Sequence, residues 1–198
     1  MKTNRSPFSQ YNQDVWALNK LSNKKGGFFV EVGAFQFPDG RMSNTLLLER
    51  DYKWGGILIE PSKNTFKNLS SRRCHKINAA ASNKDGFLNF KHGNTGATSK
   101  VSNDGDATKC YTLNSILNIF SAPKVIDFLS IDVEGHEESV LEGIDFNSRQ
   151  FLCVTIEHAL SNAKNIKSIL EKNNFTLDKE LKYDYFFVNR DLIEPKHL

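Results

Sequence analysis

Short apolar runs alternate with helix-like segments along most of the chain, and this alternation constrains the fold more than any other feature of the sequence. Six runs predict strands because they are rich in β-branched and aromatic residues and have the usual strand length: 28–32, 56–59, 76–79, 125–131, 152–156 and 185–188. Several of these runs lack alternating polar residues, which indicates strands buried on both faces.

Helix-like segments lie between these runs, at 12–21, 43–51, 63–71, 113–120, 137–142 and 162–173, with Ser43 or Asn44 as the N-cap of the second. Alternating strands and helices predict right-handed βαβ units and a doubly wound α/β fold with a mostly parallel sheet. Near the C-terminus, 175–178 and 185–189 follow one another without a helix, so we expect a hairpin that adds one antiparallel strand at the sheet edge.

The composition fits one soluble globular domain over residues 1–198, with 39% hydrophobic and 25% charged residues. No apolar run approaches the roughly 20 residues that span a bilayer. The N-terminus has no apolar signal segment, and Cys74, Cys110 and Cys153 form no C-x-x-C pair. We therefore expect free thiols and a cytoplasmic protein, either complete or one module of a longer chain.

The basic excess is small, since 26 Lys and Arg against 23 Asp and Glu give a formal charge of +3. A nucleic-acid-binding protein usually has a larger excess gathered in a stripe, so no nucleic-acid partner is expected.

Ligands of such folds bind at the carboxyl ends of the strands, where Gly33 and Glu60 follow the first two predicted strands. A carboxylate such as that of Glu60 can accept hydrogen bonds from both ribose hydroxyls. The glycine pattern of nicotinamide-binding folds is missing, and Pro38 and Asp39 in the turn suit a pyrophosphate poorly. The sequence therefore favours S-adenosylmethionine, whose sulfonium cation is compatible with acidic residues.

Acids and histidines follow the fourth and fifth predicted strands: Asp132 to His136 after 125–131, and Glu157 and His158 after 152–156. We expect Asp132, Glu157 and His158 to converge beside the cofactor. Such a group suits Mg²⁺ or Mn²⁺, or a metal-free acid–base pair that deprotonates an alcohol.

The chain resembles the FkbM-type S-adenosylmethionine-dependent methyltransferases. The matching stretches are SQYNQD from Ser9, FFVEVGA from Phe28, SNTLLLE from Ser43, GILIEPS from Gly56, NAAASNKDG from Asn78, YTLNSIL from Tyr111, DFLSIDVEGHEESVLEGIDF from Asp127 and TIEH from Thr155. The resemblance implies a Rossmann-like class I methyltransferase sheet of seven strands with the last antiparallel. It also implies O-methylation of a hydroxyl, commonly on a sugar or a secondary metabolite.

The resemblance also implies where the cofactor lies: its methionine part at Glu31 and Gly33, its ribose at Glu60, its adenine near 79–82 and its sulfonium near Asp132. The candidate cofactor-binding residues in these stretches are Glu31, Gly33, Ala34, Ser43, Asn44, Glu60, Pro61, Ser62, Ala80, Ala81 and Asp132. One departure from the family is the stretch 35–38 (FQFP), which replaces an Asn-x-Gly turn and puts two aromatic residues near the entrance.

The predicted reaction is methyl transfer to a hydroxyl, with Asp132, His136 and His158 as candidate catalytic residues and His136 or His158 as the base. A divalent ion on Asp132, Glu157 and His158 would instead lower the pKa of the alcohol. The alternatives are a methyltransferase for nucleic acids or for a non-sugar metabolite, and a cofactor-binding module without turnover. The N-terminal helical segment over 1–25 is expected either to cover the site, through Gln10, Tyr11, Gln13 and Asp14, or only to pack against the sheet.

Overall fold

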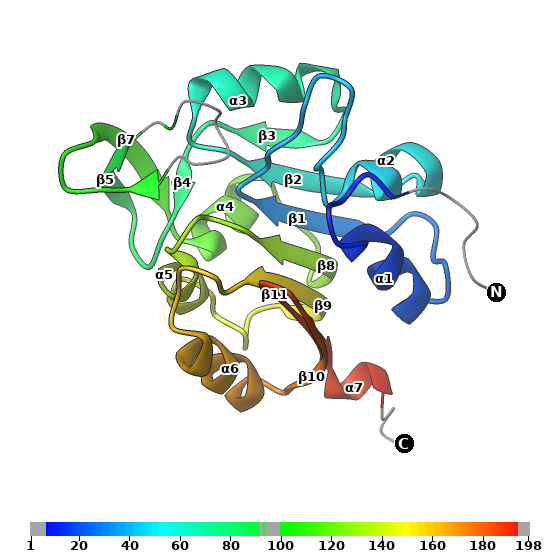
Figure 1. Cartoon of the computed structure of the whole chain (residues 1–198). Helices are drawn as coiled ribbons and strands as arrows, with labels where there is room; N and C mark the ends of the chain where they lie inside the picture. Colours follow the sequence, from blue (N-terminus) through cyan, green and yellow to red (C-terminus); the bar gives the residue numbers. More distant parts are fainter. Residues whose placement is uncertain (1–6, 92, 94–99, 194–198) are drawn as a thin grey trace.

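The structure is a computed structural model that describes residues 7–91, 93 and 100–193. Within these residues a seven-stranded sheet has the order β10-β11-β9-β8-β1-β2-β3 (Figure 1). Its strands are β1 (Phe28–Val32), β2 (Gly55–Ile59), β3 (His75–Ile77), β8 (Val125–Ile131), β9 (Gln150–Glu157), β10 (Phe175–Leu181) and β11 (Asp184–Asn189). The predicted α/β class and the seven-stranded, mostly parallel sheet are confirmed.

The strand order reverses between β1 and β8, which lie side by side and parallel. From β1 the chain proceeds outward through β2 to β3, and later returns to β8 and proceeds outward through β9 on the other side. This reversal creates the crevice in which ligands of doubly wound sheets bind.

The predicted hairpin forms from β10 and β11, but its antiparallel strand does not lie at the sheet edge. β11 pairs antiparallel with both β9 and β10, and β10 is the edge strand. The reason is apolar burial, because every residue of β11 is buried whereas β10 is mostly half-buried or exposed. The prediction that the hairpin places its antiparallel strand at the edge was therefore wrong.

Helices cover both faces of the sheet (Figure 1). One face packs against α1 (Gln13–Lys20), α2 (Leu46–Tyr52), α3 (Lys63–Asn68) and the 3₁₀ turn η1 (Leu69–Ser71), and the other against α4 (Leu113–Ile119), α5 (Glu137–Glu142) and α6 (Ala163–Lys172). The short α7 (Arg190–Ile193) follows β11. Among the described residues, no helix has both the length and the apolar character needed to cross a membrane.

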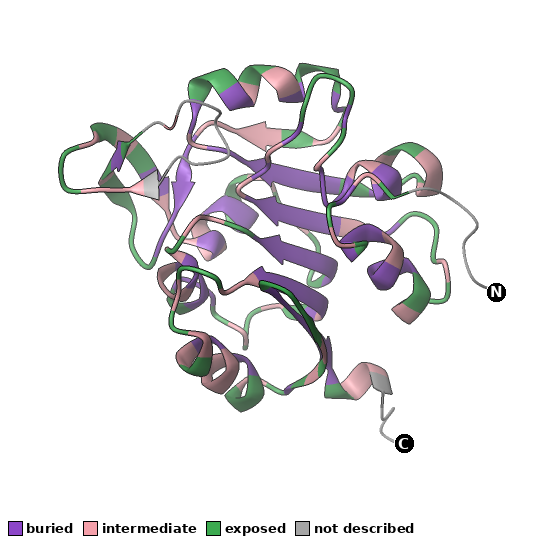
Figure 2. Ribbon diagram, viewed as in Figure 1, coloured by how far each residue is buried: buried purple, intermediate pink, exposed green. Residues whose placement is uncertain are grey.

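The side chains of each strand alternate between two hydrophobic cores. Phe29 of β1 belongs to the core under α1 and α2, whereas its neighbour Val30 belongs to the core under α4 to α6. Figure 2 shows the central strands buried along most of their length. This two-sided burial explains why the strand sequences lack polar alternation.

The beginning of α2 differs from the prediction, because Thr45, and neither Ser43 nor Asn44, is the N-cap residue. The Ser43 hydroxyl still accepts hydrogen bonds from the amides of Thr45 (3.3 Å) and Leu46 (3.1 Å). A side-chain oxygen two residues before the cap thus satisfies amides at the helix start.

A second, four-stranded sheet was not predicted. Its strands, in the order β4-β7-β5-β6, are β4 (Ala80–Ala81), β7 (Asp106–Tyr111), β5 (Gly86–Lys91) and β6 (Lys100–Val101). Most of β5 and β7 is exposed (Figure 2), so the apolar pattern that reveals buried strands is weak there. Phe90 of β5 and Cys110 of β7 are buried, and Phe90 also lines the functional site.

Candidate active site

A cavity of about 200 Å³ opens at the carboxyl ends of the parallel strands, where the strand order reverses. Six carboxylic acids line it, whereas no lysine, arginine or histidine is among its described lining residues. The six acids are Glu31, Glu60, Asp132, Glu134, Glu157 and Asp184. The site is therefore strongly acidic, and a cation bound in it would relieve the mutual repulsion.

Gly33 lies where the loop after β1 meets the loop after β8. It has φ +79°, and a Cβ atom there would lie 1.7 Å from the carbonyl oxygen of Asp132. The Asp132 amide donates to the Val32 carbonyl at 3.0 Å, which holds the two loops together. Glycine is thus required both by the backbone conformation and by the close approach of the Asp132 peptide.

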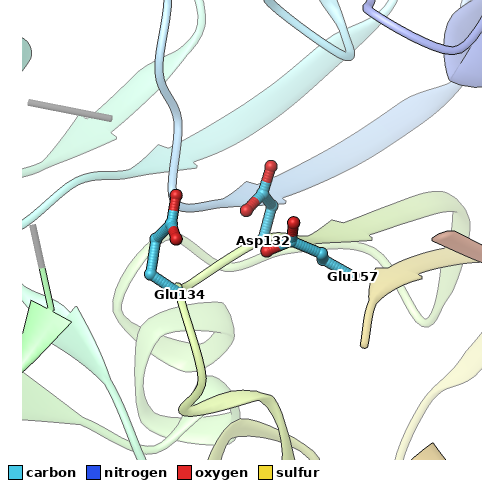
Figure 3. Close-up of side chains that lie close together, drawn as sticks. All are labelled: Asp132, Glu134 and Glu157. Atoms are coloured by element: carbon cyan, nitrogen blue, oxygen red, sulfur yellow. The ribbon is translucent and has the colours of Figure 1, made fainter. Parts of the chain in front are cut away.

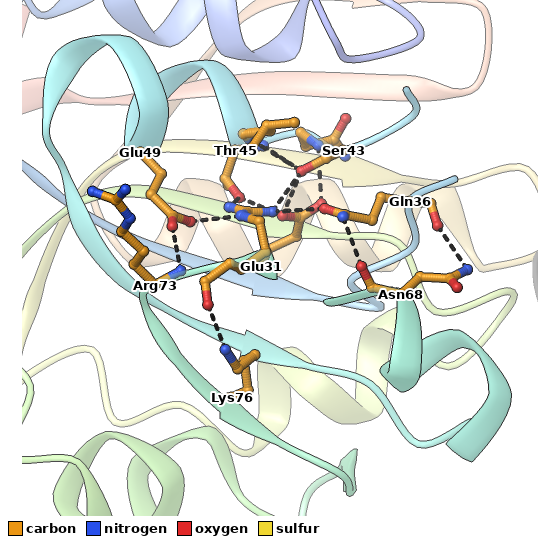
Figure 4. Close-up of polar contacts among 11 residues, drawn as sticks. Glu31, Gln36, Ser43, Thr45, Glu49, Asn68, Arg73 and Lys76 are labelled. Carbon is orange, nitrogen blue, oxygen red and sulfur yellow. Dashed lines mark hydrogen bonds and ion pairs between the residues drawn. The ribbon is translucent and has the colours of Figure 1, made fainter. Parts of the chain in front are cut away.

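Glu31, the carboxylate on β1, holds the segment that leads into α2. It accepts hydrogen bonds from the Asn44 amide at 2.9 Å, the Ser43 hydroxyl at 3.3 Å and the Thr45 hydroxyl (Figure 4). Burial raises the pKa of Glu31, although the Arg72 charge and these hydrogen bonds oppose that effect. Asn44 lines the cavity and donates from Nδ2 to Ser130 Oγ at 2.9 Å, whereas Ser43 is not among the lining residues.

Arg72 is buried near Glu31, and it links its own segment after η1 to α2 and to the loop after β1. Its guanidinium contacts Glu49 at 2.5 Å, Thr45 Oγ1 at 2.9 Å and Gln36 Oε1 at 3.1 Å. Gln36 in turn donates to the Asn68 carbonyl at 3.0 Å (Figure 4). The stretch 35–38 is therefore held in place by Gln36. Of its two aromatic residues, Phe35 lines the cavity, whereas Phe37 is exposed.

Glu60 follows β2 and lines the cavity, close enough to Glu31 for the two carboxylates to interact. One carboxylate oxygen accepts the Ser62 amide at 2.6 Å, and burial raises the pKa of Glu60 to about 7. Pro61 also lines the cavity, while Ser62 is the N-cap residue of α3.

A smaller, mostly apolar cavity adjoins the acidic one and shares Gly33, Pro61, Phe90 and Val133 with it. Its other lining residues are Val32, Ile59, Ala80, Ala81, Val101 and His136. The resemblance implied an adenine near 79–82, and Ala80 and Ala81 line this apolar cavity, but its volume of about 20 Å³ is that of a water site and is too small for a planar base.

The acids after β8 and β9 converge, as Figure 3 shows. Asp132, Glu134 and Glu157 each offer one carboxylate oxygen, and these three oxygens lie within 4.8 Å of one another. Glu134 has φ 56°, an unusual backbone conformation for a residue other than glycine. The buried Glu137 holds this loop by accepting the amides of Val133 at 3.0 Å and Gly135 at 3.2 Å.

The electrostatics of these acids are unfavourable without a bound cation. Desolvation, together with the neighbouring charges of Glu157 and Glu134, raises the pKa of Asp132. Desolvation and the Glu134 charge raise the pKa of Glu157 to about 7. Glu157 Oε2 is buried and has no hydrogen-bond partner within the described part of the chain.

His158 does not join the acids that the sequence grouped it with. Its ring stacks on Tyr185 with centroids 4.0 Å apart, and its Nε2 lies 3.6 Å from Glu180. Consecutive residues of an extended chain point to opposite sides, so Glu157 and His158 diverge. Glu134 takes the place that the prediction gave to His158.

Two further predicted site residues lie away from the acidic cavity. His136 lines the smaller cavity, where its Nε2 lies 3.0 Å from Ser82 Oγ, and burial lowers its pKa. Ala34 is buried, and its amide donates to the Ile59 carbonyl at 3.1 Å. Ala34 therefore lines neither cavity, and its backbone bond only holds the loop after β1 against the end of β2.

Asp184 is a site residue that the sequence analysis missed. It begins β11, and because β11 is antiparallel, its first residue lies at the same edge as the carboxyl ends of the parallel strands. The predicted antiparallel strand was the signal that could have located it.

Residues before β1 also line the cavity: Gln10, Tyr11 and Gln13. Asp14 has a different place, since it is fully buried and accepts hydrogen bonds from the Phe8 amide (3.0 Å), the Ser9 hydroxyl (2.6 Å) and the Val15 amide (2.7 Å). Three described residues of this segment thus line the cavity, and Asp14 holds the turn before α1.

The strand order, the antiparallel β11 and the cavity at the switch point together define an α/β protein with the class I methyltransferase fold. The family model described as "Methyltransferase FkbM domain" matches residues 31–185, so the chain belongs to the FkbM methyltransferase family and is an S-adenosylmethionine-dependent methyltransferase. A search of curated proteins found no match.

Proposed function

We propose that this protein transfers the methyl group of S-adenosylmethionine to a hydroxyl oxygen of a sugar or a similar polyol, with the help of a divalent metal ion. The observation that carries the proposal is the cavity at the switch point, lined by six acids and, among its described residues, by no basic side chain. Carboxylates attract a sulfonium cation and accept hydrogen bonds from hydroxyl groups, whereas they repel phosphates. A nucleic-acid acceptor is therefore disfavoured.

For the cofactor we propose an extended position across β1 and β2. Glu60 accepts the ribose hydroxyls, Ala80 and Ala81 contact the adenine once the smaller cavity widens to admit it, and Gly33 leaves room for the methionine part. Asn44, held by Ser130 and by Glu31, faces this same part of the cavity. Pro61 lines both cavities, so it would contact the cofactor where the ribose joins the base.

For the metal we propose Asp132, Glu134 and Glu157 as ligands, in place of the predicted set with His158. Three carboxylates whose oxygens lie within 4.8 Å of one another match the all-oxygen coordination of Mg²⁺ and Mn²⁺. The buried Glu157 oxygen without a partner among the described residues is the kind of group that a metal ion satisfies. When bound, the ion would lower the pKa of the acceptor hydroxyl.

The chain's own part of the reaction is positioning and proton removal. Neither His136 nor His158 lines the acidic cavity. Glu157, whose pKa is raised to about 7, is therefore the best-placed group to take the hydroxyl proton in the absence of a metal, since a general base works best near the operating pH.

The test is calorimetric titration with S-adenosylhomocysteine, with and without Mn²⁺, on the wild type, Glu60→Ala and the control Glu171→Gln. Glu171 is an exposed acid on α6, away from both cavities. We expect Glu60→Ala to weaken binding at least about tenfold and the control to bind as the wild type does. Absence of binding by the wild type would refute the proposed cofactor site.

The metal is tested separately by activity after chelation. We expect EDTA to abolish turnover, added Mn²⁺ or Mg²⁺ to restore it, and Glu134→Gln to raise the metal concentration required. Full activity in EDTA would refute the metal while leaving methyl transfer intact.

A further inference from the structure

The N-terminal segment, defined here as residues 8–13, spans the acidic cavity between two elements. On one side the Met42 amide donates to the Phe8 carbonyl at 2.8 Å, and the Arg50 guanidinium lies 4.5 Å from the Phe8 ring. On the other side Gln13 Nε2 donates to Asp184 Oδ1 at 3.4 Å. The segment thus connects the loop before α2 with the β10–β11 hairpin.

The conformation of the N-terminal segment is fixed by its own hydrogen bonds. Asp14 accepts two donors from Phe8 and Ser9, and Gln13 Oε1 accepts the Tyr11 amide at 2.9 Å. Gln13 is buried, and Lys182 Nζ lies 5.1 Å from the centroid of the Tyr11 ring. The side chains of the N-terminal segment that face the cavity are therefore held in place before any ligand binds.

The Gln13 end of the N-terminal segment lies on the side of the cavity away from the proposed ribose and adenine residues. The proposed ribose and adenine residues follow β2 and β3, whereas Gln13 contacts the start of β11. Four strand spacings separate β2 from β11, about 19 Å at 4.8 Å each. The segment precedes residues 31–185, which the family model matches, although its SQYNQD stretch is among those that carry the family resemblance.

We propose that the N-terminal segment is the acceptor-selecting wall of the active site, in which Tyr11 and Gln13 position the acceptor and the adjoining Asp184, which is not one of the proposed metal ligands, restricts it to neutral or amine-bearing molecules. This inference rests on the proposed methyl transfer. An aromatic ring packs against the apolar face of a sugar ring, and carboxamides and carboxylates bind its hydroxyls. Uronic acids and sugar phosphates are repelled by Asp184, since no basic side chain is among the described residues that line the cavity.

The first experiment measures methylation of four matched acceptor classes: methyl hexosides, hexosamines, hexuronic acids and hexose phosphates. We expect turnover with neutral or amine-bearing members and none with the anionic ones. A preference for an anionic class, or no turnover with any neutral or amine-bearing member, would overturn the proposal. Binding of S-adenosylhomocysteine in the same preparation would show that the cofactor site is intact in either case.

The second experiment compares Tyr11→Ala and Gln13→Ala with Asn12→Gly, using the best acceptor of that panel. Asn12 lies between them but is exposed, does not line the cavity and has φ 62°, which glycine adopts readily. We expect the first two variants to raise the acceptor KM about tenfold or more while the affinity for S-adenosylhomocysteine stays unchanged, and the control to match the wild type. Unchanged acceptor KM in both variants would overturn the role of the segment without affecting the methyltransferase assignment.

Discussion

Glu157, the last residue of β9, is the direct antiparallel partner of Asp184, the first residue of β11. Two carboxylates in register on neighbouring strands repel each other, and such a pair destabilises a sheet unless a cation or a proton compensates. Desolvation raises the pKa of both groups. The sheet therefore accepts a local loss of stability at the edge where the cavity opens, which is common at functional sites.

The stability of the protein without ligand should fall as the pH rises from about 4.5 to about 7, in part because of Glu60. Burial raises the pKa of Glu60 from 4.5 to about 7, so the folded state binds this proton more tightly than the unfolded state does. The stabilisation is complete below the unfolded pKa and is lost as the pH passes the folded one, on the order of 3 kcal/mol.

Urea unfolding at pH 5 and pH 8 measures this loss in the wild type, Glu60→Gln and the control Glu171→Gln. A glutamine at position 60 does not ionise, so that variant should lose less stability between the two pH values. Equal losses in all three proteins would show that Glu60 does not carry the effect.

Gly33→Ala should destabilise the protein by at least about 2 kcal/mol, because the new Cβ would lie 1.7 Å from the Asp132 carbonyl oxygen. The matched control is Gly55→Ala at the start of β2, where the new Cβ meets the Phe28 ring at an ordinary 3.6 Å. Urea unfolding of both variants tests the prediction, and equal stabilities would contradict the close approach of the two loops.

Arg72→Met should cost about 3–5 kcal/mol, because it leaves Glu49 and Glu31 without their buried cationic partner. Arg73→Met removes the same charge from an exposed neighbour and should change stability by less than about 0.5 kcal/mol. The free energies of unfolding of the two variants show whether the buried position of Arg72, and not merely its positive charge, stabilises the protein.

Glu157→Gln should lower kcat/KM about 100-fold or more, whereas His158→Gln should remain within about threefold of the wild type. The reason is placement, since Glu157 lines the cavity and His158 stacks on Tyr185. Steady-state kinetics with a common acceptor measure both variants. Loss of activity in His158→Gln with an unchanged fold would instead assign the histidine to the reaction.

Much of the main sheet could be predicted because its strands are buried on both faces and carry the pattern that burial imposes. The prediction for 125–131 coincides with β8, and that for 28–32 with β1. The second sheet escaped prediction because exposed strands such as β5 and β7 need few apolar residues. The position of β11 depended on which strand of the hairpin is more completely buried, and so on the packing of the whole sheet.

The sequence by itself determined the alternating α/β order and placed Gly33, Glu60, Asp132 and Glu157 at strand ends, because local apolar periodicity and strand direction fix both. Only the tertiary structure decided which neighbours those residues meet. It put Glu134 beside Asp132 and turned His158 away, since adjacent residues of an extended chain point to opposite sides. It also brought Asp184 and the N-terminal segment to the cavity, contacts between distant parts of the chain that no local pattern encodes.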